Sequence, residues 1–173
     1  IKVHHLQKEC EITTLDQTQR KLPKGALLIS DAKKPIAIAG IMGGANSEVS
    51  PNTKNILLEA AHFNPKVIRK VSKQLGLYTE ASKHFERGVD SKLIPLALDR
   101  ATALIQKVAN GEASKENAIT IATSNKPKIL TCRRSKLNKL LGTKLSLDDI
   151  KTIFERLEFI IKEETSDAIT LET

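Results

Sequence analysis

The sequence predicts an α/β protein of the α+β kind, in which a mixed or antiparallel sheet packs with helices and a partial small helical unit follows. Short apolar runs between turn residues occupy positions 1–40, as is typical of β-strands. Two amphipathic helix patterns come next, at 64–76 and 90–109. Hydrophobic residues make up 40% and charged residues 28% of the 173 positions, a composition typical of globular domains.

The predicted strands begin with a hairpin, indicated by weak alternation over 10–22. The apolar runs 26–31 and 35–40 are two further strands with a turn between them. The run NILLEAA at 55–61 is the next predicted strand, because it is too short for a helix.

The first helix is predicted to start at Asn64 and Pro65, with the asparagine as N-cap, and to end at Gly76. Its apolar face consists of Ile68, Val71 and Leu75. Its opposite face carries three lysines: Lys66, Lys70 and Lys73. This basic stripe is either a solvated outer face or a surface for phosphates.

A second helix is predicted from Asp90 to about Ala109. Pro95 is tolerated only in a first turn, so the helix proper starts after Asp90. Its expected buried face is Ile94, Leu98, Ala101, Ile105 and Val108.

The composition changes after Gly111, and we place a domain boundary near Ser124, which divides the chain into 1–124 and 125–173. Between 126 and 144 there are seven basic residues and no acidic one. Ser135 is expected to cap a short helix, and a Ser146–Asp149 capping box a second one. A strand is predicted at 159–162.

The net charge of +8 favours a polyanionic partner, or else a basic surface that serves solubility alone. With four Phe, one Tyr and no Trp, the sequence does not predict a platform for base stacking, and any nucleic acid contact is expected to be electrostatic.

The cysteines, Cys10 and Cys132, show neither disulfide-framework nor zinc spacing, and we expect a reduced, cytoplasmic protein. No membrane span or signal peptide is indicated. Because the only methionine is Met42 and the last residues continue a strand pattern, we expect a piece of a longer polypeptide.

Three segments contain polar residues or glycines that packing of a hydrophobic core does not account for. TEASKHFERGVD at 79–90 is almost wholly polar and is predicted to be a structured connection between helices. GIMGG at 40–44 suits a tight turn with close backbone approach. Glu59 stands inside the NILLEAA run, where it is either a solvent-facing edge glutamate or a site residue. No metal-binding or nucleophile motif occurs.

Together, the strings AGIMGGANSEV, NTKNILLEAAHFNPKVIRK and LGLYTEASKHFERGVD resemble the editing domain of the beta subunit of bacterial-type phenylalanyl-tRNA synthetase. The resemblance covers essentially the whole chain, with the end resembling the start of the following small domain. It implies a site that hydrolyses tyrosine wrongly attached to tRNA(Phe). The other reading is a non-catalytic module that positions RNA or acts as a scaffold.

The resemblance also assigns roles to individual residues. Glu59 is expected to bind the phenolic hydroxyl of tyrosine, Gly43 and Ala81 to line the pocket, and Thr79 to stand where the ester or water is positioned, as the catalytic candidate. With tRNA as the expected partner, the basic residues Lys66, Lys70, Lys73, Arg133 and Arg134 are weak candidates for binding it. The family also has a histidine-bearing segment upstream, and neither His4 nor His5 stands in its place, so the site is expected to be incomplete.

For the complete enzyme, the resemblance implies an ATP- and magnesium-dependent ligase that forms a heterotetramer with an alpha subunit. Since adenylation takes place on that alpha subunit, no cofactor or metal site is expected in this chain.

Overall fold

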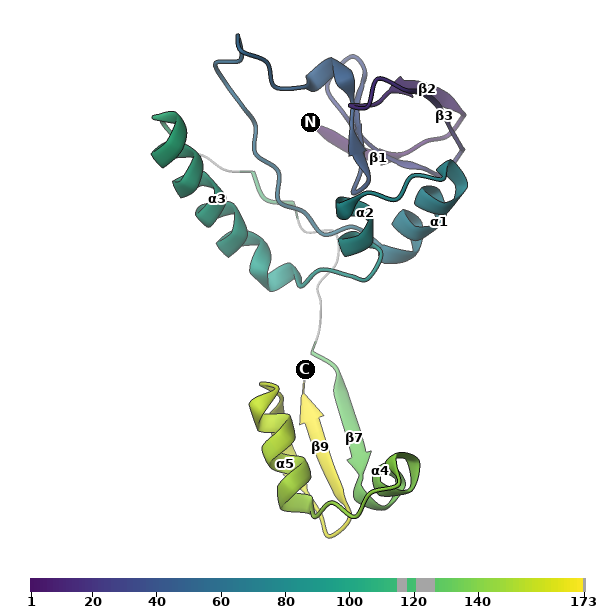
Figure 1. Cartoon of the computed structure of the whole chain (residues 1–173), viewed down its shortest axis with the longest axis vertical. Helices are drawn as coiled ribbons and strands as arrows, with labels where there is room; N and C mark the ends of the chain where they lie inside the picture. The colour runs from purple at the N-terminus through teal and green to yellow at the C-terminus, as the bar shows by residue number, and fades with distance from the viewer. Residues whose placement is uncertain (115–117, 121–126, 173) are drawn as a thin grey trace. The chain divides into compact units, whose positions relative to one another are not determined.

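The computed structural model describes residues 1–114, 118–120 and 127–172. It divides into two compact units, Ile1–Asn117 and Ala118–Thr173 (Figure 1). The boundary predicted near residue 124 lies outside the described residues. The predicted fold class is confirmed, because antiparallel sheets and helices occur together.

The first unit is built on a four-stranded antiparallel sheet in the order β1-β4-β5-β6, beside a separate hairpin of β2 and β3. The strands are β1 (Lys2–His5), β2 (Cys10–Thr13), β3 (Gln19–Leu22), β4 (Leu27–Ser30), β5 (Pro35–Ile38) and β6 (Met42–Gly43). An antiparallel bridge between Thr14 and Gly44 joins the hairpin to the end of β6. The predicted hairpin and the two strands after it are therefore confirmed.

Helix α1 (Pro65–Leu75) forms where the sequence predicted it. The side chain of Asn64 accepts a hydrogen bond from the backbone N–H of Lys66, and Gly76 ends the helix in the left-handed conformation. Ile68 and Val71 are buried and extend the sheet's apolar core. The capping residues and the apolar spacing together explain why this helix is predictable from local sequence.

The polar segment 79–90, which the sequence predicted to be a structured connection between helices, is itself partly helical. Its first half forms α2 (Glu80–Phe85), which lies beside α1 (Figure 1). Thr79 and Ser82 form a reciprocal capping box, and their side chains stabilise the first turn of the helix. The polar character of the segment therefore includes a helix-start signal.

The strand predicted at 55–61 is wrong, because this segment forms no strand in the structure. Ile56 and Leu57 keep 53% and 76% of their surface exposed. A strand needs a hydrogen-bonding partner, and the described residues provide none for this segment. An apolar run alone does not reveal whether such a partner exists.

After Asp90, which caps a single 3-10 turn, η2 (Ser91–Leu93), comes α3 (Ile94–Ala109) with Pro95 in its first turn, as expected. The predicted burial of its apolar face is only partial: Ile94, Leu98, Ala101 and Ile105 are half-buried, and Val108 is 81% exposed. The reason is that the principal contacts of α3 are with η2, and no sheet covers it among the described residues.

The second unit contains a three-stranded antiparallel sheet in the order β7-β9-β8 as well as two helices. Its elements are β7 (Ile129–Arg133), α4 (Arg134–Leu141), α5 (Leu147–Arg156), β8 (Ile160–Glu164) and β9 (Ala168–Glu172). Ile150 of α5 packs on Ile169 and Leu171 of β9, and these three side chains are the buried core. The sheet is thus a larger part of this unit than the sequence predicted.

The two predicted caps in this unit had different outcomes. The box of Ser146 and Asp149 at the start of α5 is confirmed. Ser135 does not cap α4, because the helix already begins at Arg134. Instead, the carboxylate of Asp167 accepts hydrogen bonds from the backbone N–H and the hydroxyl of Ser135, at 3.1 and 2.6 Å. This cap comes from 32 residues away and leaves no local signal.

Within the part of the chain that the structure describes, no helix has both the length and the apolar character needed to cross a bilayer.

Candidate functional site

The three strings singled out in the sequence meet at Gly40. A Cβ at this glycine would lie 2.9 Å from Cδ2 of Phe63 and 3.2 Å from Cδ2 of Phe85, and its φ of +65° is left-handed. The two phenyl rings are in contact, with centroids 5.0 Å apart. Phe63 follows Glu59 by four residues and Phe85 ends α2, so the turn before β6 packs against both other strings.

A hydrogen bond holds the start of α2 to the same turn. The hydroxyl of Thr79 donates to the carbonyl oxygen of Ile41 at 2.7 Å and accepts from the backbone N–H of Ser82 at 3.0 Å. Ile41 is buried. The contact brings α2, and with it Ala81, to the loop that leads into Gly43.

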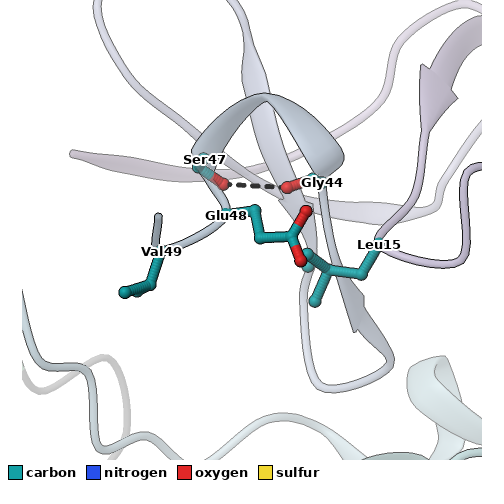
Figure 2. A pocket seen from close by; sticks show the side chains of 6 residues that line it. Leu15, Gly44, Ser47, Glu48 and Val49 are labelled. Atoms are coloured by element: carbon teal, nitrogen blue, oxygen red, sulfur yellow. Dashed lines mark hydrogen bonds between the residues drawn. The ribbon is translucent and has the colours of Figure 1, made fainter. Parts of the chain in front are cut away.

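A hollow of about 400 Å³ opens beside Gly43 (Figure 2). A Cβ at Gly43 would lie 3.1 Å from Cδ1 of Leu15, so the bare glycine keeps this wall open. Figure 2 shows the Glu48 side chain directed toward Leu15. The hollow is lined by Leu15, Gly43, Gly44, Ser47, Glu48 and Val49.

Gly44 has a structural role. Its N–H donates to the carbonyl oxygen of Ile36 at 2.7 Å, and a Cβ would lie 2.8 Å from that oxygen. The hydroxyl of Ser47 also donates to the Ile36 carbonyl, at 3.0 Å. The close backbone approach predicted for GIMGG therefore holds at Gly40 and Gly44, whereas Gly43 faces the hollow.

Comparison with known proteins identifies this arrangement. Residues 1–110 match the B3/4 domain family. The chain belongs to the B3/4 domain family. The resemblance inferred from the three strings is thereby confirmed, because the curated relatives are phenylalanine–tRNA ligase beta subunits.

Three of these relatives show the extent of the similarity. The beta subunit of Protochlamydia amoebophila is 48% identical over 159 residues, which is 91% of this chain and 20% of the relative. That of Geobacter sulfurreducens is 46% identical over 85% of this chain and 18% of its own length. That of Moorella thermoacetica is 40% identical over 93% and 20%. The chain thus spans about a fifth of these beta subunits.

Glu59 and Ala81, the predicted partners of Gly43 in this B3/4 domain, are not among the residues that line the hollow. Both are exposed, Glu59 in the extended segment before α1 and Ala81 in the first turn of α2. Partial burial raises the pKa of the Glu59 carboxyl above its ordinary value.

Thr79, the predicted catalytic residue, lies at the N-cap of α2. Its hydroxyl proton is already donated to Ile41. This geometry makes Thr79 a residue that holds α2 in place, and its catalytic role stays a prediction.

The predicted tRNA-binding lysines of α1, Lys66, Lys70 and Lys73, are all exposed. Arg133 ends β7 and Arg134 begins α4. Nε of Arg134 lies 3.6 Å from Oδ1 of Asp167, so this arginine is partly neutralised. Arg133 forms no ion pair with any described residue.

Sequence reasoning named no role for four residues that line the hollow: Leu15, Ser47, Glu48 and Val49. The N–H of Leu15 donates to the carbonyl oxygen of Gly43 at 3.0 Å across 28 positions of sequence, and no local pattern announces such a pairing. No group of three or more His, Cys, Asp and Glu side chains in the described ranges is placed to hold a metal ion.

Proposed function

We propose that this chain provides the editing site of a phenylalanine–tRNA ligase beta subunit and hydrolyses tyrosine wrongly attached to tRNA(Phe). The observation that carries the proposal is the packing of all three strings around Gly40, next to a hollow at Gly43. The names of the curated relatives support the ligase part.

The physical need for editing follows from the substrates. An apolar pocket that accepts phenylalanine cannot strongly reject an analogue that only adds a hydroxyl. A second site that hydrogen-bonds this hydroxyl selects tyrosine and spares phenylalanine, which would leave a buried polar group without a partner.

Glu59 is the residue that we assign to this selection. Desolvation raises its pKa, and a carboxylate with less water around it forms a stronger hydrogen bond with a phenol. Gly43 leaves room for the ring, because any side chain there would meet Leu15. Thr79 acts as a positioning residue that holds Ala81 near the Ile41 loop.

The complete ligase is proposed to work with an alpha subunit, ATP and Mg²⁺ at a site outside this chain. The exposed lysines of α1 are proposed to contact the tRNA backbone. Their positive charge favours phosphates and makes binding sensitive to salt.

One observation favours the second candidate, a module that positions RNA without catalysis. The hollow at Gly43 does not include Glu59 or Ala81, and both are exposed. Such a module needs the basic surfaces but no pocket.

The deciding experiment measures hydrolysis of tyrosyl-tRNA(Phe) and charging with phenylalanine by the complete ligase carrying Glu59→Ala. Losing a hydrogen bond to a charged group costs about 1.5–3 kcal/mol, so editing should fall about tenfold to a hundredfold while charging stays nearly unchanged. Ala81→Trp is the companion variant, which should block the pocket through bulk. Normal editing by both variants would favour the RNA-positioning module.

A further inference from the structure

The sheet of the second unit has one face that α5 does not cover, and we call it the open face. Helix α5 covers one face through Ile150, Ile169 and Leu171. Residues of β9 alternate between the faces, which puts Ala168 and Thr170 on the other side.

Directly opposite residues of an antiparallel pair share a face. Arg133 pairs with Ala168 and Thr131 with Thr170, so Arg133 and Thr131 project from the open face beside short neighbours. A hollow of about 360 Å³ is lined by Thr131, Arg133 and Lys136.

The cations at this hollow form no ion pair with the described residues. Arg134, next in sequence, has Asp167 as its partner, whereas Arg133 and Lys136 form no ion pair or side-chain hydrogen bond with the residues that the structure describes. Positions 128–144 carry six basic residues and no acidic one. An anion that enters the hollow therefore meets two unpaired cations from the end of β7 and the first turn of α4.

The chemistry of the lining matches a phosphate group. An arginine offers a fork of N–H donors, a lysine a point charge and a threonine hydroxyl a third donor. No aromatic side chain lines the hollow, so it is not built to stack a base. We propose that Thr131, Arg133 and Lys136 form a binding site for a backbone phosphate of RNA. This inference rests on the proposed function, because the site supplies a contact for the tRNA.

One acidic residue, Glu163, is expected to weaken the binding of an anion at this site. Glu163 of β8 is paired with Thr170 on the side of β9 away from Thr131, so its carboxylate lies on the same face as Arg133. The other carboxylate on this face, Glu172, is 2.6 Å from Nζ of Lys162 and is neutralised. Removing the charge of Glu163 should therefore strengthen RNA binding.

The test measures binding of uncharged tRNA to the whole 173-residue chain by fluorescence anisotropy, from about 50 mM to about 200 mM salt. The double variant Arg133→Gln with Lys136→Gln should bind about tenfold more weakly at low salt and lose about one to two units of the salt slope. Glu163→Gln should bind a fewfold more tightly. Lys151→Gln is the matched control, because Lys151 pairs with Glu164 at 3.1 Å and stands on α5; its binding and slope should stay as in the parent.

The proposal is overturned if the double variant, shown by circular dichroism to be folded, keeps the parent's affinity and slope. A second result would also overturn it: inorganic phosphate shifts the NMR signals of Arg133 and Lys136, but the salt dependence of tRNA binding is the same with and without these two side chains. The hollow would then bind small anions only. The tRNA in this binding test carries no amino acid, so the result does not depend on ester hydrolysis. A failure of this site is therefore distinguishable from a failure of editing, which the Glu59→Ala variant measures.

Discussion

Thr79 donates a 2.7 Å hydrogen bond from its hydroxyl to the carbonyl oxygen of Ile41, across 38 positions of sequence. The hydroxyl oxygen of Thr79 itself accepts a hydrogen bond from the backbone N–H of Ser82 and thereby caps α2. One hydroxyl thus starts a helix and fixes it to the loop before β6, close to the proposed pocket.

Replacing Thr79 by alanine should lower the free energy of unfolding of the first unit by about 1–3 kcal/mol, because both the helix cap and the bond to Ile41 are lost. Thr79→Ser keeps the hydroxyl and should cost much less. Urea unfolding of the two variants measures the difference. Equal losses would mean that the methyl group of Thr79, and not its hydroxyl, is what stabilises the fold.

Gly40→Ala should destabilise the first unit more than Gly76→Ala. Both glycines have left-handed φ, which costs a residue with a Cβ about 1–2 kcal/mol. At Gly40 the new Cβ also meets Phe63 at 2.9 Å, whereas at Gly76 no atom outside the adjoining chain lies within 4 Å. Overpacking adds about 1–3 kcal/mol, and thermal unfolding of both variants should show it. Equal melting temperatures would argue against close packing at Gly40.

Glu59→Gln should change stability in a way that depends on pH. Burial raises the pKa of Glu59 in the folded protein, so the folded state binds the proton more tightly than the unfolded state. Stability then falls as pH rises from the ordinary glutamate pKa through the raised one. The glutamine variant lacks this loss, and its stability relative to the parent should therefore increase as pH rises through this range.

Urea unfolding over this pH range, with an NMR titration of the Glu59 carboxyl, checks the expectation. A carboxyl that titrates at or below the ordinary glutamate value would contradict it, as would a stability difference that is the same at every pH.

Asp167→Asn should show the opposite dependence in the second unit. The hydrogen bond from the Ser135 hydroxyl lowers the pKa of Asp167, and Arg134 adds to the effect. The carboxylate therefore stabilises the folded state above the ordinary aspartate pKa, and this contribution disappears as pH falls through the lowered pKa.

The asparagine variant should thus be less stable than the parent at neutral pH, and the difference should shrink in acid. Unfolding followed by circular dichroism at several pH values measures it. Ser135→Ala is the matched variant, since it removes the first cause of the shift. A difference that does not vary with pH would show that Asp167 acts through its shape and not through its charge.

Elements whose signals are local were predictable from the sequence. The ends of α1 follow from Asn64, Pro65 and Gly76, and the start of α5 from Ser146 and Asp149. A capping side chain and the N–H that it accepts from are only two or three residues apart, so one short string contains the whole interaction. The same is true of the family resemblance, which rests on three continuous strings.

What required the tertiary structure is everything that depends on a partner far along the chain. Among the described residues, the segment 55–61 has a strand's composition but no neighbouring strand, and no residue of the apolar face of α3 is fully buried. In the same way, only folding brings Leu15 to Gly43 and Asp167 to Ser135. Periodicity shows that a side chain is apolar or a backbone extended, but strand pairing and burial are formed by two segments, and the sequence of one does not contain the other.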